Sequence, residues 1–217
     1  MISQYQDMHF GQDIWVLGSG KSLDFYDPAM FEGRVVVGTN FGWTNLLDEV
    51  DYMVTKYHDH ANAWVDSDRV GKVVTTRGER GHRNLEPIDD PRMVIADHNE
   101  NTVERWTDQE WPTDPEALVA THSTITTAMH WAAHIGARTI FLAGADCGTI
   151  DGDIHIDGYK LNQTNQNMLR SYDLQNRMVR DKIWQRYRTQ IVTVLPFVTP
   201  NMDGHTFRSH AGALNDS

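Results

Sequence analysis

The chain has little cysteine, little positive charge and no long apolar run. It holds one cysteine, Cys147, in 217 residues, so no disulfide can form within it. It has 19 Lys and Arg residues and 30 Asp and Glu residues, which gives a formal net charge of -11. A protein with this charge would repel DNA at long range. We expect a protein of a reducing compartment, the cytoplasm, with no nucleic-acid partner.

Two kinds of segment that would place the chain at a membrane or outside the cell are also missing from the sequence. No apolar stretch reaches the length of a transmembrane helix. No positively charged leader followed by an apolar run opens the chain, and no basic or amphipathic anchor is visible at its end. We expect a protein with no transmembrane segment and no signal peptide.

The 40% hydrophobic content is enough for one sizeable core. We expect a single domain over residues 1–198, followed by a polar, glycine-containing tail over 199–217. Residues 99–116 carry many charges and little periodicity, so they are expected to form a lid-like loop.

Short apolar runs alternate with helical patterns, which predicts an α/β, Rossmann-like fold: a mostly parallel sheet flanked by helices. The expected strands are 13–18, 34–40, 50–56, 72–76, 92–97, 139–146 and 190–197. One helix is expected to begin at the hydroxyl residues near Ser123 and to stop at Gly136. The second, over 167–188, offers for the core Leu169, Leu174, Met178, Ile183 and Trp184.

The glycine-rich turn after the first expected strand, "GSGKS" at 18–22, has the Gly-Lys-Ser that ends a P-loop. A P-loop needs another glycine five residues before its Gly-Lys pair, and Trp15 stands at that position. The turn is therefore interpreted as a strand-to-helix phosphate turn. In open α/β sheets ligands lie outside the carboxyl ends of the strands, so this turn and Asp146 both point to the site.

Three blocks resemble a known family when they are taken in order: "VLGSGKSLDFYD" (16–27), "VVVGTNFGW" (35–43) and "THSTITTAMHWAAHIGARTIFLAGAD" (121–146). The set is similar to bacterial sialyltransferases of the Campylobacter type, glycosyltransferase family 42. It is also similar to archaeal 6-hydroxymethylpterin diphosphokinase-like proteins. Both groups carry a strand, a Gly-x-Gly-x-Ser-Leu turn, a second strand ending in asparagine, and a Ser/Thr-rich helix start that leads to an Asp-terminated strand.

The resemblance implies a nucleotide site built from all three blocks. Its residues would be Gly18, Ser19, Gly20 and Ser22 in the phosphate turn, Asn40 at the base or sugar, Thr121, His122 and Ser123 at the helix start, and Asp146 at the strand end. Lys21 stands where the relatives have proline, so it would either neutralise a phosphate or lie on the surface. His122 stands where the relatives have a small residue, so it would either narrow the pocket or alter the ligand.

The resemblance also implies a catalytic histidine after the Asp strand, with tyrosines nearby. His155 is the candidate base, because an unperturbed histidine titrates near neutrality, and Tyr159 is the candidate donor to the leaving phosphate. Tyr172 lies further along the chain. The alternative is that His155 and Tyr159 merely hold their loop.

Three functions stay open on these grounds. The first is a glycosyltransferase that moves a sugar from a CMP-type donor to a hydroxyl of a glycan or small-molecule acceptor, with no obligatory metal. The second is an ATP-dependent, diphosphokinase-like phosphotransferase, in which Asp146 and the acids after it would hold Mg²⁺. The third is a nucleotide-binding module without catalysis. We expect the first.

Two further groups of residues were weighed as metal sites. His58, Asp59 and His60 mix imidazole and carboxylate, but the segment is expected to be a solvated or substrate-contacting loop. The acids at 151, 153 and 157 alternate with glycines without the spacing of a calcium loop.

Aromatic and histidine residues outside the three blocks have structural alternatives. Trp106 and Trp111 are expected either to stack on a ligand or to fix the lid to the core. His130 and His134 share a helix face but lack the Glu of a zinc protease motif, so they are expected on the helix surface.

Overall fold

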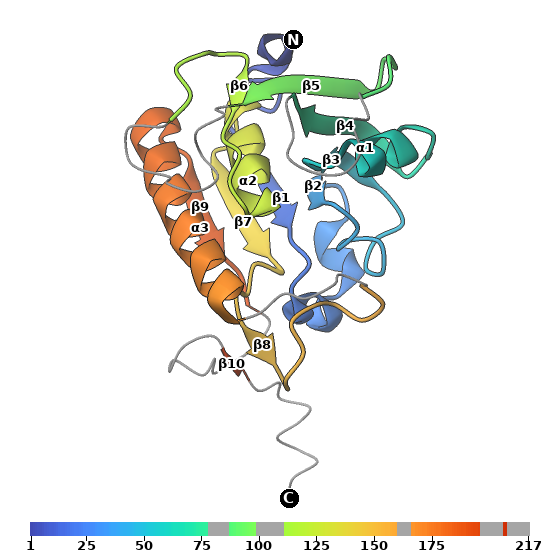
Figure 1. Ribbon diagram of the computed structural model, residues 1–217, viewed down its shortest axis with the longest axis vertical. Coiled ribbons are helices and arrows are strands. Elements are labelled where there is room, and N and C mark those ends of the chain that lie inside the picture. The colour runs from blue at the N-terminus through green and yellow to red at the C-terminus, as the bar shows by residue number, and fades with distance from the viewer. Residues whose placement is uncertain (78–86, 99–110, 160–165, 196–205, 208–217) are drawn as a thin grey trace, which may run out of the picture.

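The computed structural model describes residues 1–77, 87–98, 111–159, 166–195 and 206–207 of the chain. Eight parallel strands form one sheet with the order β6-β5-β4-β3-β2-β1-β7-β9, which confirms the predicted α/β, Rossmann-like class (Figure 1). The strands are β1 (Asp13–Leu17), β2 (Val35–Thr39), β3 (Val50–Val54), β4 (Val70–Thr76), β5 (Met93–His98), β6 (Ala117–Leu118), β7 (Thr139–Ala143) and β9 (Gln190–Thr193).

The strand order reverses at β1. Successive strands from β2 to β6 extend to one side of β1, and the chain then crosses the sheet through α2 (Thr124–His134) to place β7 on the other side. Leu17, the last residue of β1, pairs with Gly38 of β2 and with Ala143 of β7. The carboxyl ends of β1 and β7 therefore form a topological switch point, the place where open α/β sheets bind their ligands.

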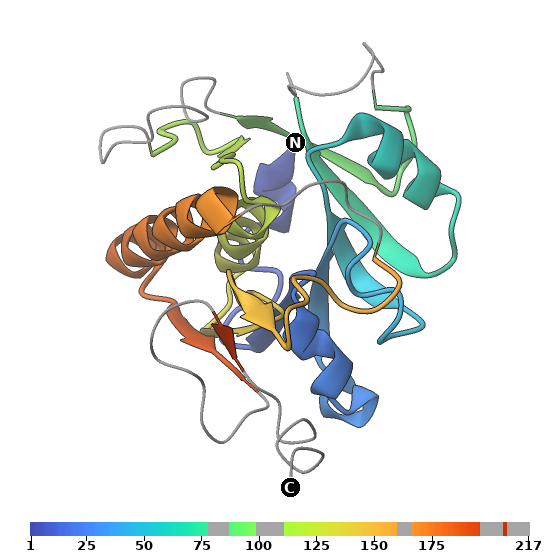
Figure 2. The ribbon, with the colours of Figure 1, turned by 60° about the horizontal axis from the view of Figure 1, so that its bottom comes forward.

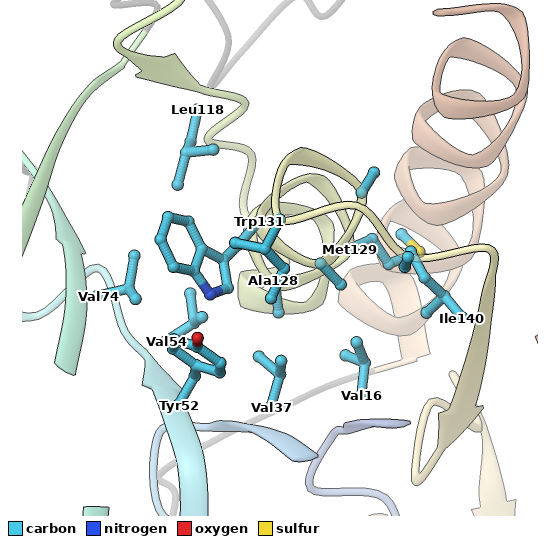
Figure 3. Packing of buried hydrophobic residues seen from close by; sticks show 14 of the residues in the cluster. Val16, Val37, Tyr52, Val54, Val74, Leu118, Ala128, Met129, Trp131 and Ile140 are labelled. Carbon is cyan, nitrogen blue, oxygen red and sulfur yellow. The ribbon is translucent and has the colours of Figure 1, made fainter. Parts of the chain in front are cut away.

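Helices cover both faces of the sheet, which is why its central strands are almost continuously apolar (Figure 2). On one face lie α2 and α3 (Gln166–Tyr187); Figure 3 shows Trp131, Ala128 and Met129 of α2 packed on side chains of the sheet. The other face is covered by α1 (His58–Val65) and the 3-10 helices η2 (Lys21–Phe25) and η3 (Pro28–Phe31). No helix in the described ranges is long and apolar enough to span a membrane.

Several predicted boundaries need correction. The strand expected over 139–146 ends at Ala143, so Asp146 lies three residues beyond it, and β9 ends at Thr193. β6 and the two-residue pair of β8 (Thr149–Ile150) with β10 (Thr206–Phe207) were not predicted, because runs this short carry no periodicity. Within the expected tail, 206–207 thus pairs with the folded body. The rest of 199–217 and residues 99–110 of the expected lid, Trp106 included, lie outside the described residues.

The core face of α3 was predicted only in part. Leu169 and Ile183 are buried as expected, whereas Leu174 and Trp184 are 60% and 52% exposed. Val179 takes a core position instead. The expected set spread around the helix, and only the stripe that meets α2 and β9 is covered.

His130 and His134 were expected on the surface of α2, and this prediction is wrong. Both are buried, with 2% and 6% of their surface exposed, because α2 is covered on the side away from the sheet as well. His130 Nδ1 accepts a hydrogen bond from the Val119 N–H (2.9 Å), so its Nε2–H faces the Tyr187 hydroxyl at 2.8 Å. His134 Nε2 donates to the Ile2 carbonyl (2.9 Å).

Trp111, at the end of the expected lid, fixes the chain to this buried histidine. Its ring lies 4.5 Å from that of His130, and only 7% of its surface is exposed. Trp111 was expected either to stack on a ligand or to fix the lid to the core, and in the structure it packs against the core.

Burial makes folding pH-dependent at His130. It lowers the pKa of His130 from 6.5 to about 3, so His130 is protonated at a lower pH in the folded protein than in the unfolded chain. The stabilisation is present above pH 6.5 and is lost as the pH falls towards 3. When the pH falls from 7 to 5, the unfolded chain binds a proton at His130 and the folded protein does not. We expect this difference to lower the free energy of unfolding by about 2 kcal/mol.

Urea unfolding of the wild type and of His130→Gln at the two pH values measures this contribution. The variant should be less stable at pH 7 and should lose about 2 kcal/mol less than the wild type on acidification. Equal losses in the two proteins would contradict a buried, neutral His130.

Candidate functional site

A cavity of about 110 Å³ lies at the switch point. Five segments of the described chain line it: Ser19 and Gly20 after β1, Asn40 after β2, residues 122–125 at the start of α2, residues 144–148 after β7, and residues 154, 155 and 159 beyond β8. Tyr57, Leu169 and Tyr172 complete the wall. Most of the predicted site residues therefore meet in one place, although they come from distant parts of the sequence.

The loops after β1 and β7 touch backbone to backbone. The amides of Gly18 and Gly20 donate to the carbonyls of Ala143 and Gly144, each at 2.8 Å. A Cβ atom on Gly18 would lie 2.1 Å from the Gly144 carbonyl oxygen, far inside van der Waals contact. Glycine at position 18 is therefore required by the fold, whatever the ligand.

Asp146 fastens the phosphate turn from the β7 side. Its carboxylate accepts hydrogen bonds from the Ser22 amide (2.8 Å) and the Ser22 hydroxyl (2.5 Å), at the start of η2. Burial raises the pKa of Asp146, and the two bonds from Ser22 oppose this effect. Asp146 lines the cavity, and both of its carboxylate oxygens accept hydrogen bonds from Ser22. Ser22 and Gly18 are not among the residues that line the cavity.

Lys21 lies away from the cavity. Its Nζ contacts Asp24 at 2.8 Å and Asp157 at 2.5 Å, with Asp153 at 3.7 Å. Only 9% of the Lys21 surface is exposed, so the alternative of a surface lysine is wrong. The phosphate role of Lys21 stays a prediction. The charge of Lys21 joins the turn to the segment that carries His155.

His155 is held over the turn by the backbone. Residues on either side of it bond to the turn, through Lys21 N to Ile154 O (3.1 Å) and Ile156 N to Ser19 O (3.0 Å). His155 Nδ1 lies 3.2 Å from the Ser19 carbonyl oxygen and 3.3 Å from the Ser19 hydroxyl. In the tautomer that donates from Nδ1 to the carbonyl, the lone pair of the neutral ring is on Nε2. Burial lowers the pKa of His155, partly offset by this bond, and so favours the neutral ring.

Tyr159 lies beside His155, with 5.0 Å between the ring centroids. Burial raises the pKa of Tyr159 to about 12, against the opposing effect of hydrogen bonds with Ser19 and Asn40. The phenol is therefore protonated at neutral pH and can donate to an anion. Tyr57 and Tyr172 line the same cavity, and Tyr57 was missed because no motif singles it out.

Asn40 has the left-handed backbone that asparagine tolerates, with φ of 49°. Its Oδ1 accepts from the Thr55 hydroxyl (2.9 Å) and its Nδ2 donates to Thr124 Oγ1 (3.4 Å). These partners fix the amide at the junction of β2, β3 and the start of α2. Asn40 therefore joins the cavity wall to the start of α2.

The residues at the start of α2 have two roles: Thr121 makes structural hydrogen bonds, and His122 and Ser123 line the cavity. Thr121 lies behind the wall, where its hydroxyl bonds to that of Thr126 (2.8 Å) and accepts the Ser123 amide (3.2 Å). Ser123 and His122 line the cavity, and the Ser123 side chain makes no capping hydrogen bond. The first amides of α2 therefore lack a side-chain cap at the end where the helix dipole is positive.

The two segments weighed for metal binding have other roles. The expected loop around His58 is wrong, because His58 begins α1 and is buried with its Nε2 2.8 Å from the Thr76 carbonyl. Asp153 and Asp157 contact the Lys21 ammonium group. In the described parts of the chain, no group of three or more His, Cys, Asp or Glu side chains is placed to hold a metal ion.

Comparison with protein-family models, curated proteins and solved structures gave no match. The resemblance to sialyltransferases and to diphosphokinase-like proteins therefore stays a prediction from the three sequence blocks.

Because the loops after β1 and β7 are in close contact, replacing Gly18 by alanine should destabilise the protein more than replacing Gly33. Gly18→Ala forces a methyl group onto a backbone oxygen that cannot rotate away, so we expect a loss of at least about 3 kcal/mol in the free energy of unfolding. Gly33 has φ of 65° and open space around it, so Gly33→Ala should cost only about 1–2 kcal/mol. Chemical denaturation compares the two; equal costs would mean that the loops are not packed as described.

Proposed function

We propose that the switch-point cavity binds a nucleotide sugar and that the protein transfers the sugar from a CMP-type donor to a hydroxyl group of a glycan or small-molecule acceptor. The observation that carries the proposal is the meeting of Ser19, Asn40, Ser123 and His155 around one cavity. Fold alone does not fix function, so the argument depends on the chemistry of these groups.

The charges of the cavity favour a donor with little negative charge. None of the described residues that line it is a lysine or an arginine. The start of α2 contributes positive potential equivalent to about half an elementary charge. The Lys56 ammonium group adds to it from behind the wall, where it donates to the Thr121 carbonyl. A CMP-sugar carries a single phosphodiester charge, which tyrosine hydroxyls and uncapped helix amides can meet. ATP has several more charges and would need cations at the same place.

The proposed reaction uses His155 as the base and Tyr159 as a donor. His155 Nε2 takes the proton of the acceptor hydroxyl while its oxygen attacks the anomeric carbon of the sugar. The bond from that carbon to the phosphate oxygen breaks, and CMP leaves with the electron pair. Tyr159 and the first amides of α2 donate to the phosphate as its charge increases.

The phosphotransferase is supported less well by the contacts of the acids it requires. Both oxygens of Asp146 accept hydrogen bonds from Ser22, and Asp153 and Asp157 contact the Lys21 ammonium group. Binding Mg²⁺ would have to break these contacts. The cavity volume of about 110 Å³ suits a phosphoryl group and part of a sugar, so the rest of a nucleotide would extend beyond it.

A thermal-shift panel of CMP, CDP, UDP, ADP and ATP, each with and without Mg²⁺, tests the proposal. A ligand at about 100 times its dissociation constant adds roughly 2.7 kcal/mol, a shift of several degrees for a chain of this size. We expect CMP to stabilise the protein without Mg²⁺ and CMP-sugars to release CMP. Stabilisation by ATP with Mg²⁺ alone would favour the phosphotransferase, and CMP binding without turnover would leave a binding module.

The base assignment predicts a pH profile. Activity requires neutral His155, whose pKa burial holds below 6.5, so kcat/KM should stay level from pH 7 to 6.5 and fall only below that value. His155→Gln should lower kcat by about 10²–10⁴-fold and remove this acid limb.

His122→Gln is the matched control, because His122 lines the same cavity but is given no proton-transfer role. It should change KM more than kcat and keep the acid limb. An unchanged profile in His155→Gln would rule out His155 as the base.

A further inference from the structure

A second cavity, of about 140 Å³, lies between the loop after β7, α3 and the end of β9. Leu142, Ala145 and Leu195 give it apolar walls. Four polar side chains of α3 complete it: Asp173, Asn176, Arg177 and Arg180. Their spacing of three and four residues puts them on one helix face. Ala145 and Asp146 separate this cavity from the switch-point cavity, since they line both.

Arg180 brings to the cavity a positive charge that forms no ion pair with a described carboxylate. Arg177 is paired with Asp173 at 2.8 Å, so its charge is met within the helix. Arg180 instead donates to two neutral oxygens, the Ile191 carbonyl (3.1 Å) and the Thr193 hydroxyl (3.3 Å). Among the ion pairs of the described residues none includes Arg180. An anion in the cavity would find this guanidinium group already oriented by its two neutral partners.

Asn176 brings a buried polar atom without a partner. Only 6% of its surface is exposed, its Nδ2 donates to Cys147 Sγ (3.3 Å), and its Oδ1 has no hydrogen bond. Turning the amide over would let Oδ1 accept from the thiol and leave Nδ2 unpaired instead. Either way one polar atom of Asn176 lacks a partner, which is a costly state for a buried group.

We propose that this second cavity binds a small anion that also carries a hydroxyl group, with the anionic group on Arg180 and the hydroxyl on the Asn176 amide. A hydroxyl both donates and accepts, so it satisfies the amide in either orientation. Phosphorylated polyols and hydroxy acids share this chemistry, and a volume of about 140 Å³, that of about five waters, fits their smaller members. The proposal does not depend on glycosyl transfer at the other cavity.

Asp146, the acid shared by the two walls, does not prevent anion binding. Both of its oxygens already accept hydrogen bonds from Ser22 on the opposite side. Asp173 is likewise held by Arg177. The guanidinium of Arg180 is therefore the charge that a ligand in this cavity would meet.

Titration of the isotope-labelled chain, followed by NMR, tests the proposal. The probes are glycerol 3-phosphate and glycerate, which distinguish a phosphate from a carboxylate source, with inorganic phosphate and glycerol as single-group controls. We expect saturable shifts of the Asn176 side-chain amide and the Arg180 Nε–H with at least one of the two-group probes. Inorganic phosphate should bind about tenfold more weakly or worse, and glycerol should not bind.

Two variants and one control locate the binding. Arg180→Gln and Asn176→Leu should each weaken it by about tenfold or more, and Asn176→Leu should fold as well as the wild type because it removes an unpaired polar group. Arg170→Gln, exposed on the same helix and outside the cavity, should bind as the wild type does.

Four results would overturn the proposal, and the first three concern the second cavity itself. They are the absence of saturable shifts up to about 10 mM probe, shifts that survive in both cavity variants, and inorganic phosphate binding as tightly as glycerol 3-phosphate. Shifts confined to the switch-point cavity would also reject the second site, while leaving the proposed function intact.

Discussion

The contact between the loops after β1 and β7 is the constraint on which the site depends. Gly18 lies against the Gly144 carbonyl where no side chain fits, and Asp146 completes the contact by bonding the amide and hydroxyl of Ser22. A helix-crossover sheet leaves a crevice between two such loops at the switch point. Here backbone hydrogen bonds join the two loops at their base, so the position of the crevice is fixed by the backbone.

The long crossing from β6 to β7 explains the rest of the cavity wall. α2 must run over β1, β2 and β3 to reach β7, so it is buried on almost every side and its first turn arrives beside Asn40. A helix in this position has to satisfy polar groups internally, which is what His130 and His134 do through Val119, Tyr187 and Ile2. The start of α2 has no side-chain cap, so its first amides contribute positive potential at the cavity.

Much of this could be predicted from the sequence, because the signals were local. A short apolar run ended by glycine located β1, and a valine-rich run located β2. The carboxyl-end rule placed the turn at Ser19 near Asp146, and the family resemblance added Asn40. What failed depended on distant contacts. The burial of His130 follows from Val119 and Tyr187 packing around α2, which no spacing within the helix reveals.

The charge partners of Lys21 were also out of reach of the sequence. The motif suggested a phosphate contact or an exposed position, but the lysine meets carboxylates more than 130 residues away, Asp153 and Asp157. Tyr57 was missed for a similar reason, since it reaches the cavity only because β3 ends beside Asn40. Side chains that converge through the fold leave no pattern in a single sequence.

The most direct measurement is a crystal structure of the chain grown with CMP. The account predicts that the phosphate lies at the first amides of α2, within hydrogen-bonding distance of Tyr159, with His155 facing the open side of the phosphate. CMP bound at any other surface, or in the cavity with its phosphate turned away from α2, would contradict the central claim.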